Sequence, residues 1–234
     1  MKKSNVVNMQ DPHLVNLATY KPTRKSLKDR YIVRNLIERG LVMIYGGTGT
    51  GKTMLTEWLC YQLCRADIRQ PNRQQLFLGR LCYPCCVYYY TLETMVDILY
   101  SRAKKYDGRT SKKFNILDYS SSRLTDTRWL EDMEYRASQH VLSKKKEHLV
   151  FVLDPLLNLE LTQVKDINSP DMMTFVSKIM RFTHDPKYGC PTVIIIHHTN
   201  KVGNYLGSST IGDIVNGSIQ IDRISDDKIN LHFR

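Results

Sequence analysis

The stretch "IYGGTGTGKT", residues 44–53, decides the fold, because a cluster of glycines, a lysine and a threonine follows a short apolar run there. Residues 46–53 fit the pattern G-x-x-x-x-G-K-[ST], with a predicted strand at 41–45 before them and a predicted helix at about 52–66 after them. Glycines let the backbone turn its N–H groups inward around phosphates, and the helix N-terminus adds a partial positive charge. The stretch therefore predicts a phosphate-binding loop formed by Gly46, Gly47, Thr48, Gly49, Thr50, Gly51, Lys52 and Thr53.

Two side chains of this loop have specific predicted roles. Lys52 is expected to reach the β and γ phosphates of a nucleotide, and the hydroxyl of Thr53 is expected to ligate Mg²⁺. ATP and Mg²⁺ are therefore the expected cofactors. Hydrolysis needs further groups, which must come from other parts of the chain.

Two acidic residues that follow predicted strands fit those needs. "LVFVLD", residues 149–154, ends at Asp154, which fits the acidic residue that holds Mg²⁺ or its water, so Thr53 and Asp154 are the predicted metal-binding pair. Glu93 follows the strand "CVYYYT", residues 86–91, at the edge where ligands bind in open α/β sheets, and there it would orient the attacking water. The alternative for Glu93 is a place in the first turn of a solvent-exposed helix.

A histidine pair ends the buried strand in "VIIIHHTNK", residues 193–201. Such a pair is unusual, because a buried histidine must find a partner or stay neutral. One interpretation is that one histidine hydrogen-bonds the γ-phosphate and passes its presence to the following loop. The competing interpretation is a structural histidine that caps this loop.

Short apolar runs alternate with helical stretches along the chain, and this alternation predicts an α/β fold with a mainly parallel central sheet and helices on both faces. The tyrosines at 88–90 and the tryptophans at 58 and 129 are expected in its core. The predicted strands are 41–45, 86–91, 114–119, 149–154, 192–197 and 218–224, and the predicted helices are about 52–66, 94–106, 126–143 and 169–184.

Length and composition set the remaining limits. The 234 residues suffice for one sizeable domain, expected at 31–234, and residues 1–30 form a polar, basic arm that either links subunits or is a loose tail. The net charge of +11 favours a polyanionic partner such as nucleic acid.

No apolar run is long enough for a bilayer and the start lacks a signal peptide's apolar core, so a cytoplasmic protein without a membrane partner is expected. Cys82, Cys85 and Cys86 lack a second ligand pair, and no metal is assigned to them.

Four segments in order resemble the RepA-type plasmid replicative helicases of the RecA/DnaB-like ATPase superfamily. They are "GGTGTGKT", "YYYTLE", "LDPLLNLE" followed by "DIN", and "IIIHHTNK" followed by "GSS", and the resemblance covers roughly residues 31–224. It implies a RecA-like P-loop NTPase fold, with Lys52 and Thr53 binding nucleotide and Mg²⁺. It also implies that Glu93 is the catalytic glutamate, Asp154 the Walker B aspartate and His198 the sensor.

The resemblance also implies a homo-oligomeric ring, usually a hexamer, that holds ATP between subunits and grips single-stranded DNA in its channel. The channel loops would be about 158–169 and 200–212, and the residues in them best suited to touch DNA are Lys165, Lys201, Asn204 and Tyr205. The implied function is a DNA helicase in the replication of a plasmid, phage or similar element, with replication-initiation proteins as further partners.

One departure from the family pattern concerns an arginine that relatives carry near the Gly-Ser-Ser segment to complete a neighbour's site. Here Leu206 precedes Gly207, and no arginine lies between Lys201 and Arg223. An arginine finger raises turnover by orders of magnitude. Lys201, Arg223 or a residue elsewhere would have to replace it. An ATP-gated DNA-binding or helicase-loader module with slow hydrolysis is therefore the alternative function, and a signalling ATPase without DNA is a third.

Overall fold

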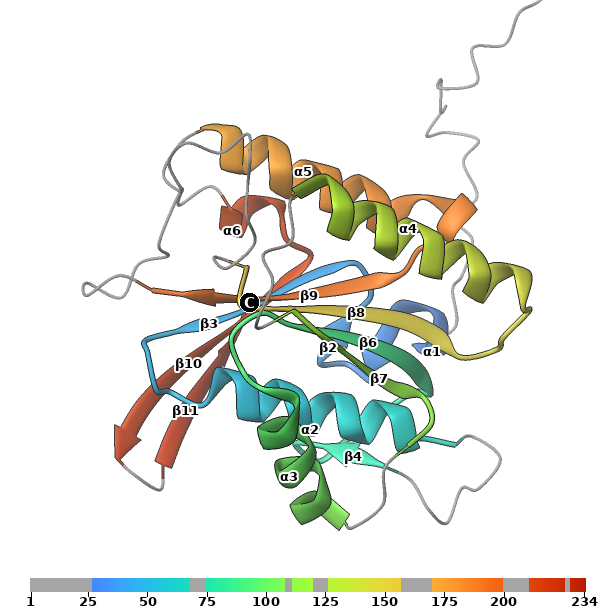
Figure 1. Cartoon of the computed structure of the whole chain (residues 1–234). Coiled ribbons are helices and arrows are strands. Elements are labelled where there is room, and N and C mark those ends of the chain that lie inside the picture. Colours follow the sequence, from blue (N-terminus) through green and yellow to red (C-terminus); the bar gives the residue numbers. More distant parts are fainter. Residues whose placement is uncertain are drawn as a thin grey trace, which may run out of the picture.

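The computed structural model describes residues 27–67, 75–107, 111–119, 126–156, 170–199, 211–225 and 228–234. Its centre is a seven-stranded sheet in the order β11-β10-β3-β9-β8-β6-β7 (Figure 1). Every neighbouring pair is parallel except β10 and β11, which form an antiparallel hairpin. The strands are β3 (Leu41–Gly46), β6 (Cys85–Thr91), β7 (Phe114–Asp118), β8 (His148–Asp154), β9 (Thr192–His198), β10 (Gly217–Ser225) and β11 (Lys228–Phe233).

Helices cover both faces of this sheet, as Figure 1 shows. One face carries α2 (Lys52–Arg65) and α3 (Val96–Asp107), and the other carries α4 (Asp126–Leu142), α5 (Pro170–His184) and the short α6 (Ile211–Ile214). The predicted α/β class, the mainly parallel sheet and the helices on both faces are confirmed. The smaller elements are α1 (Leu27–Arg30), the 3-10 helix η3 (Pro186–Tyr188) and two hairpins, β1 (Tyr31–Val33) with β2 (Ile37–Glu38) and β4 (Leu76–Phe77) with β5 (Arg80–Leu81).

The central strands are buried on both faces because successive side chains enter two different cores. In β8, Phe151 and Leu153 pack with the α4 and α5 side chains, whereas Val150 and Val152 pack with those of α2 and α3. The same alternation runs through β3 and β9. Continuous apolar runs such as "LVFVL" are therefore accommodated without exposing either set of side chains.

The aromatic residues expected in the core are largely found there. Tyr89, Tyr90 and Trp129 are buried, while Tyr88 and Trp58 are half-buried and pack against the two cores. The basic arm, with the exception of α1, lies outside the described residues, so the proposed division at residue 30 stays a prediction. Within the described part of the chain, no helix has the length and apolar character needed to span a membrane.

Candidate functional site

The predicted site residues come from the carboxyl ends of four strands. Gly46 ends β3, Asp154 ends β8, His198 ends β9, and Glu93 lies in the loop directly after β6. Strands β3, β9, β8 and β6 are consecutive neighbours and all parallel, so their carboxyl ends meet at one edge of the sheet. The structure thus gathers residues that are far apart in the sequence at the edge where open α/β sheets bind ligands.

The backbone of the loop between β3 and α2 suits an anion. Gly51 has φ of 93°, a left-handed conformation that glycine adopts without strain, and no side chain caps the helix N-terminus that follows it. The first turn of α2 also contains no acidic residue. At Gly46 a Cβ atom would lie 2.3 Å from the carbonyl oxygen of Ile221, so only glycine fits there. The N–H groups of the helix N-terminus therefore have no side-chain acceptor, as phosphate binding requires.

Lys52 lies folded into this loop, with 5% of its surface exposed. Its Nζ donates hydrogen bonds to the carbonyl oxygens of Gly46, at 3.0 Å, and Gly47, at 2.7 Å. Burial lowers the pKa of Lys52, while the negative charges of Asp154 and Glu93 act in the opposite direction. The ammonium group therefore lies next to the backbone that would surround a phosphate.

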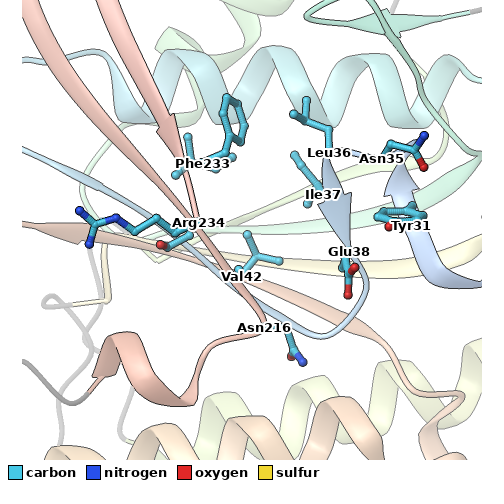
Figure 2. Close-up of a pocket in the computed structure, with 12 residues that line it drawn as sticks. Tyr31, Asn35, Leu36, Ile37, Glu38, Val42, Asn216, Phe233 and Arg234 are labelled. Atoms are coloured by element: carbon cyan, nitrogen blue, oxygen red, sulfur yellow. The ribbon is translucent and has the colours of Figure 1, made fainter.

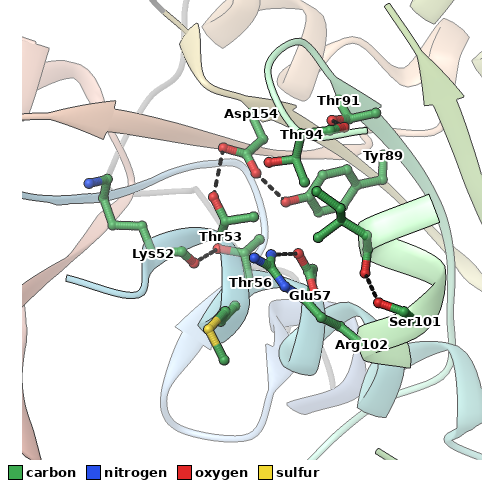
Figure 3. A network of polar contacts seen from close by, with 12 residues as sticks. Lys52, Thr53, Thr56, Glu57, Tyr89, Thr91, Thr94, Ser101, Arg102 and Asp154 are labelled. Atoms are coloured by element: carbon green, nitrogen blue, oxygen red, sulfur yellow. Dashed lines mark hydrogen bonds and ion pairs between the residues drawn. The ribbon is translucent and has the colours of Figure 1, made fainter. Parts of the chain in front are cut away.

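Asp154 lies beside the start of α2 and is 4% exposed. Its Oδ1 accepts a hydrogen bond from the Thr53 hydroxyl at 3.3 Å, and its Oδ2 accepts one from the Tyr89 hydroxyl (Figure 3). Burial raises the pKa of Asp154, and the hydrogen bonds from Tyr89 and Thr53 oppose that shift. A hydroxyl and a carboxylate oxygen side by side are hard ligands of the kind Mg²⁺ takes together with phosphate oxygens and water. Thr53 and Asp154 therefore fit a Mg²⁺ ion, which would neutralise charge on the phosphates.

Glu93 and His198 come from the carboxyl ends of β6 and β9, the strands on either side of β8. The side chain of Glu93 is exposed, and its charge acts on Lys52, Asp154 and His198. His198 is half-buried, and both burial and the charge of Lys52 lower its pKa, while Glu93 opposes them. The N–H of Thr199 donates to the carbonyl oxygen of Gly46 at 3.2 Å, which ties the end of β9 to the start of the loop. The structure thus brings Lys52, Asp154 and His198 to one edge of the sheet, with Glu93 in the loop after β6 at the same edge.

Two residues contact the site of their own chain in ways that the sequence did not predict. Tyr89 was expected only as a core residue, and its ring is buried, but its hydroxyl reaches Asp154. No signal in the sequence could have found this contact, because it depends on the pairing of β6 with β8, which places Asp154 opposite Thr91, on the same face of β6 as Tyr89. Arg223 of β10 donates from Nη1 to the carbonyl oxygen of Gly49 at 3.1 Å, so this arginine contacts the phosphate-binding loop of its own chain.

The predicted DNA contacts Lys165, Lys201, Asn204 and Tyr205 lie outside the described residues. A cavity of about 310 Å³ lies elsewhere, next to the amino ends of β3 and β10 (Figure 2). Its walls include Tyr31, Ile37 and Val42, together with Asn216 and Phe233. It contains none of the predicted site residues and lies at the opposite edge of the sheet from the glycine loop.

The fold and the grouped residues define a P-loop ATPase with a RecA-like sheet. The chain belongs to the AAA domain family AAA_25, whose model matches residues 17–204. No match was found among curated proteins.

Two solved structures are similar in fold. A KaiC-like protein from the archaeon Pyrococcus horikoshii OT3 is 16% identical, with 91% of this chain and 87% of that chain covered and a TM-score of 0.49. The flagellar accessory protein FlaH from Methanocaldococcus jannaschii is 12% identical, with 83% and 76% covered and a TM-score of 0.43.

Proposed function

We propose that the protein is a ring-forming ATPase that couples ATP hydrolysis to movement on single-stranded DNA, as the replicative helicase of a plasmid, phage or related mobile element. One observation carries this proposal. Strands β8 and β9 are neighbours, and beyond Asp154 and His198 they lead into the segments 157–169 and 200–210. Those segments contain the residues proposed to contact DNA, Lys165, Lys201, Asn204 and Tyr205. In this proposal, a movement of Asp154 or His198 during hydrolysis would therefore move the segments that contact DNA.

The proposed chemistry uses the charges at the sheet edge. Lys52 binds the β and γ phosphates, while Thr53 and Asp154 hold Mg²⁺. Glu93 orients a water molecule and accepts its proton as the water attacks the γ-phosphorus and ADP leaves. His198, which pairs in the sheet with Gly46 at the start of the glycine loop, donates a hydrogen bond to the γ-phosphate, and this bond is lost after hydrolysis.

The charge of the chain supports a nucleic-acid partner. The net charge of +11 attracts a polyanion, and contacts to phosphates release counterions, so DNA binding should weaken steeply with added salt. A signalling ATPase without DNA would show no such dependence. Replication-initiation proteins are proposed as additional partners of the ring.

The first test is the ATPase rate with and without single-stranded DNA. We expect DNA to raise the wild-type rate, and Lys52→Ala to lower it by on the order of 100-fold or more. The double variant Lys165→Ala/Lys201→Ala should keep the basal rate and lose the stimulation. Lys144→Ala/Lys145→Ala is a matched control, because these lysines follow α4 at the opposite edge of the sheet. An unchanged rate on DNA addition would contradict the helicase proposal.

Ring formation is tested by native mass measurement with a non-hydrolysable ATP analogue and single-stranded DNA. A hexamer or another closed ring is expected. A monomer under these conditions would argue against the ring.

The second candidate is an ATP-gated DNA-binding or helicase-loader module with slow hydrolysis. Two observations favour it: no arginine lies between Lys201 and Arg223, and Arg223 contacts the loop of its own chain. The two candidates differ in the behaviour of Glu93→Gln. If the protein is a loader, its function is binding, and Glu93→Gln should still bind DNA or a partner helicase fully. If it is a helicase, its function is unwinding, and Glu93→Gln should lose this activity.

A further inference from the structure

Glu57 is a buried carboxylate on the helix that begins with Lys52 and Thr53. Its side chain is 4% exposed, and its Oε1 forms an ion pair with Nη1 of Arg102 at 2.9 Å (Figure 3). Its other oxygen, Oε2, is buried and has no hydrogen-bond partner among the described residues. Burying a carboxylate with an unpaired oxygen is unfavourable, and an apolar residue of similar size would stabilise this position more. Stability alone therefore does not explain the ion pair.

The partner of Glu57 belongs to the helix that follows Glu93. Helix α3 begins at Val96, and the N–H groups of Ile98 and Leu99 in its first turn donate to the carbonyl oxygen of Met95, which lies two residues after Glu93. The loop and α3 are therefore continuous, and a shift of the helix would carry Glu93 with it.

The other end of the Glu93 loop is held by the sheet. The N–H of Leu92 donates to the carbonyl oxygen of Asp154 at 2.8 Å, and the hydroxyl of Thr91 donates to the carbonyl oxygen of Thr94. The sheet thus fixes where the loop starts, and the packing of α3 on α2 fixes where it ends. The described side-chain contacts between these helices include the Glu57–Arg102 pair and a hydrogen bond from the Tyr106 hydroxyl to the Met54 carbonyl at 3.3 Å.

We propose that the Glu57–Arg102 ion pair is a positioning contact that locks α3 to α2 and so holds Glu93 at a fixed place relative to Lys52 and Thr53. This inference rests on the proposed role of Glu93 in hydrolysis and needs no DNA. Charge is useful here because an ion pair with defined geometry fixes the register between two helices, whereas apolar side chains tolerate sliding. Neither Glu57 nor Arg102 touches the nucleotide in this proposal.

The test compares the basal ATPase of Glu57→Gln, Arg102→Met and the double variant with wild type. Each single variant should lower kcat about tenfold, because small misplacements of a catalytic group have effects of this size or larger. KM and nucleotide affinity should change less than about twofold, because Lys52 and Thr53 remain in place. The double variant should be no slower than either single variant, since both remove the same contact. Glu38→Gln is the matched control, because it removes the exposed Arg30–Glu38 ion pair, which is also 2.9 Å long. It should leave kcat, KM and nucleotide affinity at the wild-type values.

A second background separates positioning from general damage. In Glu93→Gln, where the positioned group is already missing, Glu57→Gln should cause no further loss. An equal loss in both backgrounds, or a fall in nucleotide affinity as large as the fall in kcat, would overturn the proposal.

Hydrogen exchange gives a readout that does not depend on catalysis. In Glu57→Gln the amides of residues 92–99 should exchange faster than in wild type, while those of β8 and β9 should not change. Unchanged exchange in the loop would refute the positioning role whatever the activity shows. Conversely, a failure of DNA to stimulate the wild-type enzyme would contradict the helicase proposal and leave these comparisons intact.

Discussion

Two tyrosine–aspartate pairs on opposite faces of the sheet make the same hydrogen bond in different surroundings. Tyr89 and Tyr90 are consecutive in β6, so their side chains point to opposite faces, and their hydroxyls donate to Asp154 and Asp132 respectively. Asp132 also forms an ion pair with Arg136, one turn along the same helix, at 2.7 Å. Asp154 makes no ion pair with any described residue, and its second hydrogen-bond donor is the Thr53 hydroxyl.

This difference separates a structural carboxylate from one prepared for a ligand. The side chain of Asp132 is 25% exposed, and a neighbouring arginine neutralises its charge. Asp132 therefore needs no further cation. Asp154 is almost fully buried, and burial raises its pKa. Its negative charge lies at the carboxyl edge of the sheet beside Thr53, where a cation would compensate it. A tyrosine partner alone therefore does not distinguish a functional carboxylate from a structural one. The presence or absence of a cationic side chain beside the carboxylate does.

The largest expected effect comes from removing each charge in turn. Asp154→Asn should lower ATP turnover by on the order of 100-fold, because the metal loses its carboxylate ligand. It should leave stability unchanged or slightly higher, since a buried charge is removed. Asp132→Asn should leave turnover near wild type and lower stability by about 1 kcal/mol, through the weakened contacts to Tyr90 and Arg136. ATPase assays and urea unfolding measure the two quantities, and equal losses of turnover in both variants would remove the distinction.

A third carboxylate extends the comparison to pH. Glu57 has an arginine partner, as Asp132 has, but it is buried more deeply, and burial raises its pKa to about 7 despite the ion pair with Arg102. In the unfolded chain this pKa is about 4.3. Between these values the folded state binds the proton and the unfolded state does not, so this group makes stability fall as pH rises from about 4.3 to about 7.

Over this pH interval the contribution of Glu57 to the free energy of unfolding falls by at most on the order of 3 kcal/mol. This is an upper value, because the side chain of Arg102 is 31% exposed and solvent screens the pair. The measurement is urea unfolding of wild type and Glu57→Gln between pH 5 and pH 8. The stability difference between the two proteins isolates the contribution of Glu57 from those of all other ionisable groups. A difference that stays constant with pH would show that Glu57 ionises normally.

The arginines provide the next contrast. Arg136→Met should lower stability by about 1 kcal/mol, because Asp132 keeps only its tyrosine and the guanidinium is lost from the ring of Tyr88, 5.1 Å away. Arg223→Met should leave stability within about 0.5 kcal/mol, since Arg223 is exposed, and should lower turnover about fivefold through its place at Gly49. Unchanged turnover in Arg223→Met would place the activating residue elsewhere.

The sequence was sufficient for six of the seven strands of the central sheet, for its four long helices and for the residues at the carboxyl edge, because these follow from local patterns. The glycine motif, the strand ending at Asp154 and the helix beginning at Pro170 each have a signal within a few residues. The partners of Tyr89 and Tyr90 were not predictable, because both depend on which strand and which helix pack beside β6. The Glu57–Arg102 pair also depends on which helices pack together. It was missed because a glutamate in a helix is ordinarily exposed.

The small hairpins β1–β2 and β4–β5 were also missed. Their strands span two or three residues, too short for any period of apolar residues to emerge. The cavity at the amino edge is formed partly by the first of these hairpins, so it could not be predicted either.

The smallest expected effects concern the hydroxyl groups that the two pairs share. Tyr89→Phe removes one of the two described donors to Asp154 and leaves that oxygen buried, so turnover should fall about threefold and stability by about 1 kcal/mol. Tyr90→Phe should lower stability by a similar amount without affecting turnover, because Asp132 keeps Arg136 and lies on the other face of the sheet. Parallel ATPase and urea measurements on both variants test this. If Tyr90→Phe slowed turnover as much as Tyr89→Phe, the tyrosines would act through the strand they share, and the separation of the two faces would not hold.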